Sequence, residues 1–229
     1  KCFITNAGTE MSGFVIVAAV TGQRPNGKKE ISNIIVPKNT PGYTQDRPYL
    51  KLGHRASDTR PLFFTDCRVP EKNLLGERGA GLRQFLETLD GGRIAIAAMG
   101  VGLIQACLDL STAYAKGRIQ FGRPIFDFQA VQFKLADMAV NLEMARLMCY
   151  KAAMLKDAGR RCTKEAAIAK LFASEAAVRA AEDGVQIHGG YGYTQECPLS
   201  RYYRDAKLLT IGEGTSEVQR LVIARHLGG

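Results

Sequence analysis

One acidic side chain, Glu213, lies between two glycines near the C-terminal end of the sequence. Flanking glycines let a ligand approach the backbone closely and leave amide groups free to donate hydrogen bonds. A carboxylate in this setting can act as a general base while nearby N–H groups polarise a carbonyl. The alternative is structural, since Ser216 with Gln219 forms a capping box and Glu217 suits the positive end of a helix dipole. Capping alone leaves the position of Glu213 unexplained.

The glycine-rich stretch 186–193 is a second candidate for ligand binding. Three glycines within four positions suit close passage of a phosphate or nucleotide. They do not form a GxGxxG motif after a strand, so a nicotinamide site is not indicated. Gly189 also suits an ordinary helix end. We interpret His188 as a packed or surface histidine rather than a catalyst.

Two further stretches combine charge with helix-breaking residues. In 118–124, Arg118 and Arg123 can bind phosphate and Phe121 can pack on a flat ring, although the stretch can equally do no more than separate two helices. In 89–93, two glycines interrupt a helical pattern at a cost of roughly 1 kcal/mol each relative to Ala. We expect a ligand or a close helix crossing to offset that cost, and we expect Arg93 to contact substrate or a buried carboxylate.

The elements that position these residues change in type along the chain. Short β-branched runs at 14–20 and 31–36, separated by a turn signal at Asn26-Gly27, predict two strands. Residues 62–64 and 67–69 predict a further strand.

Helical periodicity predicts a long helix from Gly81 toward Tyr114, a second over 127–156, and a third that is capped by Thr163 and ends near 187. Shorter helices are expected at 198–206 and 216–226. The apolar stripe of the second helix consists of Val131, Leu135, Met138, Leu142, Ala145 and Met148. We therefore predict an α+β chain, mainly α, with a partial β-domain over 1–75 and a helical, four-helix bundle domain over 76–229.

Composition narrows the class of protein further. The 229 residues are 46% hydrophobic and 23% charged, and the net charge of +9 is spread along the chain, which favours a solvated basic surface over a nucleic-acid site. Six cysteines occur without a CxxC pair, so we expect reduced thiols and no metal site. No stretch of about 18 apolar residues lacks a charge, so no membrane helix is expected, and no signal sequence is seen. The chain opens as if within a strand, and we expect it to be a piece of a longer protein.

Taken together and in order, these stretches resemble the acyl-CoA dehydrogenase family, in particular its short-chain and medium-chain members. The resemblance covers nearly the whole chain. The segments that carry it are Phe3–Asn6, Lys51–Ser57, Val69-Pro70, Leu75-Gly76, Leu89–Arg93, Arg118–Gly122, Gln186–Gly190, Arg204–Lys207 and Glu213–Glu217. The family's fold implies an N-terminal helical domain, a middle β-domain and a C-terminal four-helix bundle. This chain matches the end of the β-domain and the bundle, and the N-terminal helical domain is absent from it.

By this resemblance the cofactor is FAD, and in the family the loop 186–190 commonly reaches the flavin of a neighbouring subunit. The helix N-terminus at 215–217 suits phosphate. We expect a water-excluding cleft that Glu213 shares with the stretches around Arg118 and Gly189. The residues that match cofactor-binding positions are Phe3, Ile4, Thr5, Arg118, Gln129, Gln186, Ile187, His188, Gly189, Gly190, Thr215, Ser216 and Glu217.

The resemblance implies dehydrogenation of an acyl-CoA thioester to trans-2-enoyl-CoA. Glu213 matches the catalytic base, which takes the α-proton while the β-hydrogen leaves as hydride to the flavin. The electrons then pass to an electron-transfer flavoprotein. Some relatives carry the base on the helix that contains 89–91, where this sequence offers only glycines at 91 and 92. The residues that match acyl-CoA-binding positions are Asp90, Gly91, Gly92, Arg93 and Gly214.

The family also implies a homo-oligomer, either tetramer or dimer, in the bacterial cytoplasm or the mitochondrial matrix. Three alternatives remain open at this point. The protein can be an acyl-CoA oxidase that uses oxygen, a non-catalytic relative of the same fold that binds nucleic acid, or a fragment that only assembles. We expect the 229-residue chain by itself to bind FAD weakly or not at all, because one wall of the site is missing.

Overall fold

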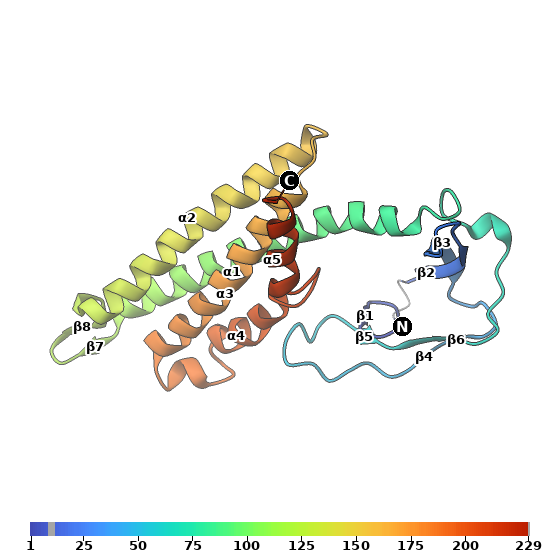
Figure 1. The fold of residues 1–229 in the computed structure, drawn as a ribbon. Helices are drawn as coiled ribbons and strands as arrows, with labels where there is room; N and C mark the ends of the chain where they lie inside the picture. Colours follow the sequence, from blue (N-terminus) through green and yellow to red (C-terminus); the bar gives the residue numbers. More distant parts are fainter. Residues whose placement is uncertain (9–11, 229) are drawn as a thin grey trace. The chain divides into compact units, whose positions relative to one another are not determined.

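A computed structural model describes residues 1–8 and 12–228 of the protein (Figure 1). The chain divides into two compact units, Lys1–Thr88 and Leu89–Gly229. The helix α1 (Gly81–Gly117) begins in the first unit and ends in the second. The assignment of domains to 1–75 and 76–229 stays a prediction about the organisation of the protein.

The first unit is built from short antiparallel strand pairs. Its longest pair is the hairpin of β2 (Phe14–Gln23) and β3 (Lys29–Pro37). The pairing runs from Phe14 opposite Pro37 to Gln23 opposite Lys29, with a shift of register between Val20 and Gly22. Gly27 closes the turn with φ +76°, a conformation that glycine adopts without steric cost. The two strands predicted at 14–20 and 31–36 are therefore confirmed.

The remaining strands of this unit pair over two or three residues. They are β1 (Ile4–Thr5) with β5 (Thr59–Arg60), and β4 (Tyr43–Gln45) with β6 (Leu62–Phe64). The strand predicted at 62–64 is confirmed, whereas the continuation at 67–69 is wrong. Asp66 turns the chain with φ +48°, and Pro70 has no N–H to donate to a ladder. A short 3₁₀ turn follows at Glu71–Asn73.

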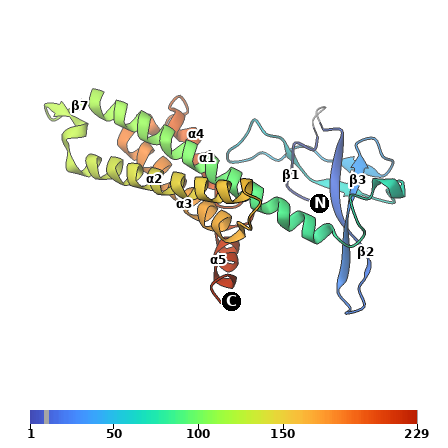
Figure 2. The same cartoon turned by 90° about the horizontal axis from the view of Figure 1, so that it is seen from above.

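The second unit is a bundle of helices (Figure 2). Beside the C-terminal part of α1 run α2 (Gln129–Asp157) and α3 (Thr163–His188), while α4 (Pro198–Leu209) and α5 (Ser216–Arg225) pack against α3. In Figure 2, α5 is directed across the long helices rather than along them. Between α1 and α2, the strands β7 (Ile119–Gln120) and β8 (Arg123–Pro124) form a small hairpin, and 3₁₀ turns occur at Ile125–Asp127 and Tyr191–Tyr193. The predicted helices are confirmed.

Small side chains let the three long helices approach one another closely. The core face of α3 is almost entirely alanine, and a Cβ added to Gly100 of α1 would lie 2.9 Å from the carbonyl oxygen of Ala173. On α2, Leu135, Met138 and Leu142 are buried as the apolar stripe predicts. Val131 and Met148, at other positions of the stripe, pack partly buried against the same core.

The start of α3 differs from the sequence prediction in one detail. Cys162 is the N-cap residue, and Thr163 is already helical. The hydroxyl of Thr163 donates instead to Asp90 Oδ2 of α1 over 2.6 Å. The Thr163 side chain, which the local sequence predicted to cap the helix, therefore makes a contact between two helices instead.

The helix α1 is long and apolar enough to cross a membrane. This is weak evidence for a membrane span, because a helix in the core of a protein meets the same criteria. In the bundle this helix contributes Ala97, Ile104, Cys107 and Ala115 to the core. Burial raises the pKa of the Cys107 thiol to about 12, so this thiol is unreactive at neutral pH. Within the described part of the chain, no group of three His, Cys, Asp or Glu side chains is placed to hold a metal ion.

Two glycines of α1 should respond in opposite ways to alanine. Gly102 has open space around its Cα, so Gly102→Ala should raise stability by about 1 kcal/mol through helix propensity. Gly100→Ala should lower stability, because forcing α1 away from Ala173 typically costs about 1–3 kcal/mol and exceeds that gain. Denaturant unfolding of both variants measures the difference, and equal stability of the two would contradict the crossing described above.

Candidate active site

The loop between α4 and α5 holds Glu213 in an uncommon backbone conformation. Glu213 has φ +55° and Gly214 has φ +93°, both in the left-handed region. For a residue with a side chain this conformation is sparsely populated, and it persists where the surroundings impose it. Gln219 supplies part of that restraint, since its Nε2 donates to the carbonyl oxygens of Glu213 (3.1 Å) and Gly214 (2.9 Å). Lys170 Nζ donates to the Gly214 carbonyl as well, over 2.7 Å.

The carboxyl group of Glu213 rests against the backbone of α1 at Gly92. A Cβ added to Gly92 would lie 2.3 Å from Glu213 Oε2 and 2.6 Å from its Cδ. Only glycine admits the carboxyl group at this distance. In this chain the side chain of Glu213 occupies the space that glycine leaves at position 92, and a ligand contact there stays a prediction.

Beside this contact lies a group of buried polar side chains. Arg93 is 4% exposed and forms an ion pair with Asp90, with 2.9 Å between Nη1 and Oδ1. The sequence predicted that Arg93 contacts either substrate or a buried carboxylate, and in the structure its partner is a carboxylate. The buried Lys170 faces the same region from α3. The part of the molecule that holds Glu213 therefore contains two buried cations.

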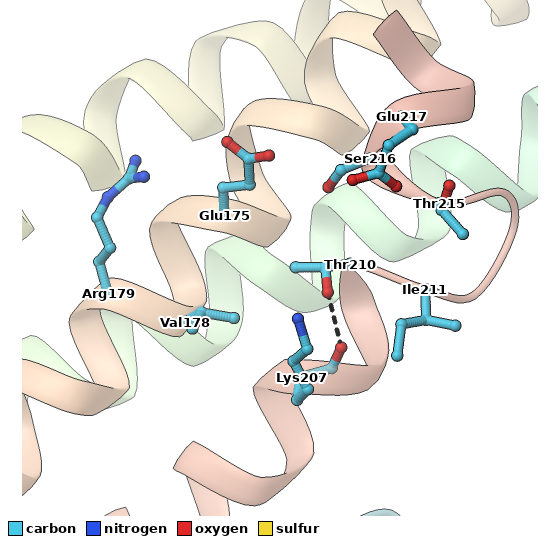
Figure 3. Close-up of a pocket in the computed structure, with 9 residues that line it drawn as sticks. All are labelled: Glu175, Val178, Arg179, Lys207, Thr210, Ile211, Thr215, Ser216 and Glu217. Carbon is cyan, nitrogen blue, oxygen red and sulfur yellow. Dashed lines mark hydrogen bonds between the residues drawn. The ribbon is translucent and has the colours of Figure 1, made fainter.

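A cavity of about 370 Å³ opens beside the N-terminus of α5 (Figure 3). Glu217 is exposed, and bonds from its own N–H and from the Thr215 hydroxyl lower the pKa of its carboxyl. Positive charge from Lys207 acts in the same direction. Glu213 does not line this cavity, which is formed by Glu175, Val178, Arg179, Lys207, Thr210, Ile211, Thr215, Ser216 and Glu217.

The cap of α5 is Thr215, so the capping box predicted at Ser216 is wrong. Thr215 has extended backbone angles and its hydroxyl accepts from the Val218 N–H (3.4 Å), whereas Ser216 already belongs to the helix. Among the described residues, Ser216 Oγ is a buried atom with no hydrogen-bond partner. Gln219, the other member of the predicted box, bonds the Glu213 loop instead.

At the other end of the bundle, His188 is packed rather than exposed. It is 7% exposed, its Nδ1 donates to the Gly184 carbonyl (2.9 Å), and its ring stacks on Tyr114 with 4.1 Å between centroids. Burial lowers the pKa of this imidazole. These contacts support the interpretation of His188 as a packed histidine, and its ring centroid lies 6.5 Å from that of Tyr191.

The residues around His188 leave room for a ligand. Gly189 and Gly190 are exposed, and a Cβ added to either would meet no atom within 4 Å. Gln186, Arg118 and Gln129 are also exposed, and Ile187 is buried. Arg123, in contrast, lies over the ring of Phe128 at 4.3 Å, and Phe121 is 93% exposed.

Within one chain, Glu213 does not share a cleft with the stretches around Arg118 and Gly189, and that expectation is wrong. Glu213 contacts α1 at Gly92 and His188 contacts the same helix at Tyr114, so about 33 Å of helix separates the two groups at 1.5 Å per residue. Glu213 is moreover an exposed residue of this chain. The water-excluding surroundings expected for it are not supplied by the bundle alone.

The three predicted cofactor contacts near the N-terminus belong to the first unit. Phe3 has φ +57°, is 74% exposed and lies with its ring 5.1 Å from that of Tyr49. Ile4 and Thr5 form β1. An exposed aromatic ring on a strained backbone suits a ligand contact, and that role stays a prediction.

Lys170 and the second role of Gln219 were missed by the sequence analysis. Lys170 lies at helical spacing from Ala166, Ala173 and Ala177, so it is the one charged residue on an apolar face of α3. That pattern was available in the sequence, because a lysine on a core face requires a partner. The bond from Gln219 to Glu213 depends on loop conformation and has no sequence signal.

Comparison with known proteins places the chain in a family. A family model described as acyl-CoA dehydrogenase, C-terminal domain, matches residues 79–228. The chain is 60% identical to the probable acyl-CoA dehydrogenase YngJ of Bacillus subtilis, over 99% of this chain and 59% of that protein. It is 52% identical to the mitochondrial short-chain specific acyl-CoA dehydrogenase of Rattus norvegicus, over 99% of this chain and 54% of that protein. The solved structure of butyryl-CoA dehydrogenase from Megasphaera elsdenii superposes with a TM-score of 0.95 at 44% identity, covering 100% of this chain and 59% of that one.

The chain belongs to the acyl-CoA dehydrogenase family, and the resemblance inferred from the motifs is confirmed. The predicted fold class, an α+β chain that is mainly α and ends in the family's helical bundle, is confirmed as well. The chain spans a little over half the length of the three relatives named above.

The pKa of His188 predicts how acid affects stability. Because burial lowers this pKa, the unfolded chain binds a proton on His188 at higher pH than the folded chain does. The folded state should therefore lose stability as pH falls from 7.5 to 5.5. Unfolding experiments on the wild type and on His188→Gln should show the wild type losing more stability over this interval. An identical loss in both would contradict the buried, neutral imidazole.

Proposed function

We propose that the protein containing this chain oxidises short-chain acyl-CoA thioesters at the α and β carbons, with Glu213 as the base. The observation that carries the proposal is the placement of the Glu213 carboxyl group against Gly92 by a restrained loop. Membership of the acyl-CoA dehydrogenase family supports the reaction. Similarity to a short-chain specific and a butyryl-CoA enzyme supports the substrate class.

The chain's own groups suit removal of a proton next to a thioester. The carboxylate of Glu213 accepts the α-proton, and the developing negative charge on the thioester oxygen requires a donor. The Glu213 N–H is a candidate donor, because it bonds no backbone carbonyl in the described part of the chain. Loss of one such donor typically costs about 2.7–4 kcal/mol of transition-state stabilisation. Asp90, Gly91, Gly92, Arg93 and Gly214 are the proposed acyl-CoA contacts.

When bound, FAD supplies the acceptor for the β-hydrogen as hydride. Two groups of residues in the bundle fit parts of a dinucleotide. At the N-terminus of α5, the cavity offers Lys207, Arg179 and the unpartnered hydroxyl of Ser216. At the other end of the bundle, the open faces of Gly189 and Gly190 admit a close approach by a ligand. The remaining proposed contacts are Phe3, Ile4, Thr5, Arg118, Gln129, Gln186, Ile187, His188, Thr215 and Glu217.

We propose, on the grounds of family membership, that the protein is a homo-oligomer in which each flavin contacts two chains. About 33 Å of α1 separates the contact of Glu213 at Gly92 from the stack of His188 on Tyr114, so these two groups lie at opposite ends of one bundle. A row of exposed apolar side chains along α2 supplies a surface for such an assembly. Its members are Phe133, Val140, Met144, Leu147, Tyr150 and Met154.

The proposed electron acceptor is an electron-transfer flavoprotein, on the grounds of family membership. An oxidase of the same fold would pass electrons to oxygen instead. The two differ in an assay with butyryl-CoA in air, where only the oxidase produces stoichiometric peroxide. A protein that turns over only when an electron-transfer flavoprotein is added would support the dehydrogenase.

Replacement of the base should abolish chemistry without abolishing binding. In the whole protein, Glu213→Gln should lower the rate of anaerobic flavin bleaching by butyryl-CoA by about 10²–10⁴-fold, because a general base contributes about that factor. FAD content and acyl-CoA affinity should stay close to those of the wild type. Glu143→Gln, an exposed change on α2, is the matched control and should bleach normally. Bleaching of Glu213→Gln at the wild-type rate would refute the assignment.

At position 92, the space needed by the Glu213 carboxyl should affect the reaction rate more than the helix propensity of alanine affects stability. Gly92→Ala places a methyl group where the Glu213 carboxyl lies, so the carboxyl must move. We expect the rate of flavin bleaching to fall by at least about tenfold, since small misplacements of a catalytic group can cost about 10²-fold. Gly102→Ala, at an open position of the same helix, should retain the wild-type rate. A Gly92→Ala enzyme as fast as Gly102→Ala would contradict the proposed geometry.

A further inference from the structure

Lys170 is fully buried in α3 with no carboxylate ion-paired to it among the described residues. A buried ammonium group is costly unless it is paired or hydrogen-bonded, so its presence calls for a specific partner. That partner is the carbonyl oxygen of Gly214, 2.7 Å from Nζ. The bond joins the middle of α3 to the loop that holds Glu213, 44 residues further along the chain.

The charges that face Lys170 come from every element around it. Arg93 approaches from α1, Glu213 from the loop, Glu217 from α5 and Glu175 from α3 itself. Burial and the charge of Arg93 lower the pKa of Lys170 to about 8, while the three carboxylates oppose the shift. Lys170 is therefore mainly protonated at neutral pH and loses its charge in mildly alkaline solution.

The bond from Lys170 acts on the segment whose conformation places the base. The Gly214 carbonyl accepts from both Lys170 and Gln219, and the Glu213 carbonyl accepts from Gln219. These bonds restrain two successive residues with positive φ. The side chain of Glu213 starts from this restrained backbone and reaches Gly92.

We propose that Lys170 is a positioning residue for Glu213, which holds the Gly214 carbonyl so that the Glu213 carboxyl stays against Gly92. The ammonium group also adds a positive charge on the protein side of the base. The inference rests on the proposed function, because it takes Glu213 as the base of the reaction. Lys170 itself contacts neither substrate nor reacting atoms in this account.

The test compares Lys170→Met with Lys164→Met in the whole protein loaded with FAD. Both variants remove one lysine from α3, but Lys164 is partly exposed and lies outside the proposed site. Lys170→Met should slow flavin bleaching by butyryl-CoA about tenfold to hundredfold, the usual effect of losing a hydrogen bond to a charged donor. Acyl-CoA affinity should change by less than about twofold, because four of the five proposed acyl-CoA contacts lie on α1, away from the loop. Lys164→Met should match the wild type in both.

Hydrogen exchange separates positioning from general destabilisation. In Lys170→Met, amide exchange should accelerate in the peptide that covers 211–217 and stay unchanged in β2, β3 and the middle of α2. Faster exchange throughout the bundle, or unchanged exchange in 211–217, would overturn the proposal. If Lys170→Met fails to fold, Lys170→Gln takes its place with the same expected results, because its side chain is one atom shorter and carries no charge.

The pH dependence gives a readout that a purely structural lysine would not produce. The wild-type bleaching rate should decline above about pH 8, as Lys170 loses its charge. This alkaline decline should be absent from Lys170→Met, and equal profiles would count against the proposal. If the wild type shows no bleaching with any acyl-CoA, the proposed function fails, and the exchange experiment still decides whether Lys170 holds the loop.

Discussion

The contact between the Glu213 carboxyl group and the backbone of α1 at Gly92 is the constraint on which the site depends. It explains why a helix in the core of the bundle carries glycine at a position where alanine would be more stable. It also explains the conformation of the loop, because both Glu213 and Gly214 must adopt positive φ for the carboxyl to arrive there. The buried donors Lys170 and Gln219 then serve a single purpose, which is to hold that loop.

Helix α1 determines how far apart the two candidate binding regions of the bundle lie. It carries the Glu213 contact at Gly92 and the aromatic stack of His188 at Tyr114, separated by six turns of helix. The close crossing with α3 at Gly100 lies between them and keeps both at defined distances. The Glu213 region and the His188 region are therefore two separate places on the bundle of one chain.

Much of the fold followed from the sequence, because periodicity and turn residues report on burial directly. The hairpin around Gly27 and the core face of α2 are examples. One error arose where a tertiary contact overrides a local preference, because Thr163 bonds Asp90 instead of capping α3. A second was a shift of one residue between two suitable caps, since Thr215 caps α5 in place of Ser216. Glu213 stood out as a candidate because its glycine neighbours are poor packing choices, whereas its contact with Gly92 joins positions 121 residues apart and leaves no local signal.

The most direct test of the account follows the α-proton itself. An acyl-CoA analogue with sulfur in place of the β-carbon can lose its α-proton but has no β-hydrogen to give up as hydride. Incubated in D₂O with the whole FAD-loaded protein, it should take up one deuterium at the α-carbon, as observed by NMR, and the Glu213→Gln variant should leave it unlabelled. Deuterium uptake by that variant at the wild-type rate would show that another group removes the proton and would contradict the central claim.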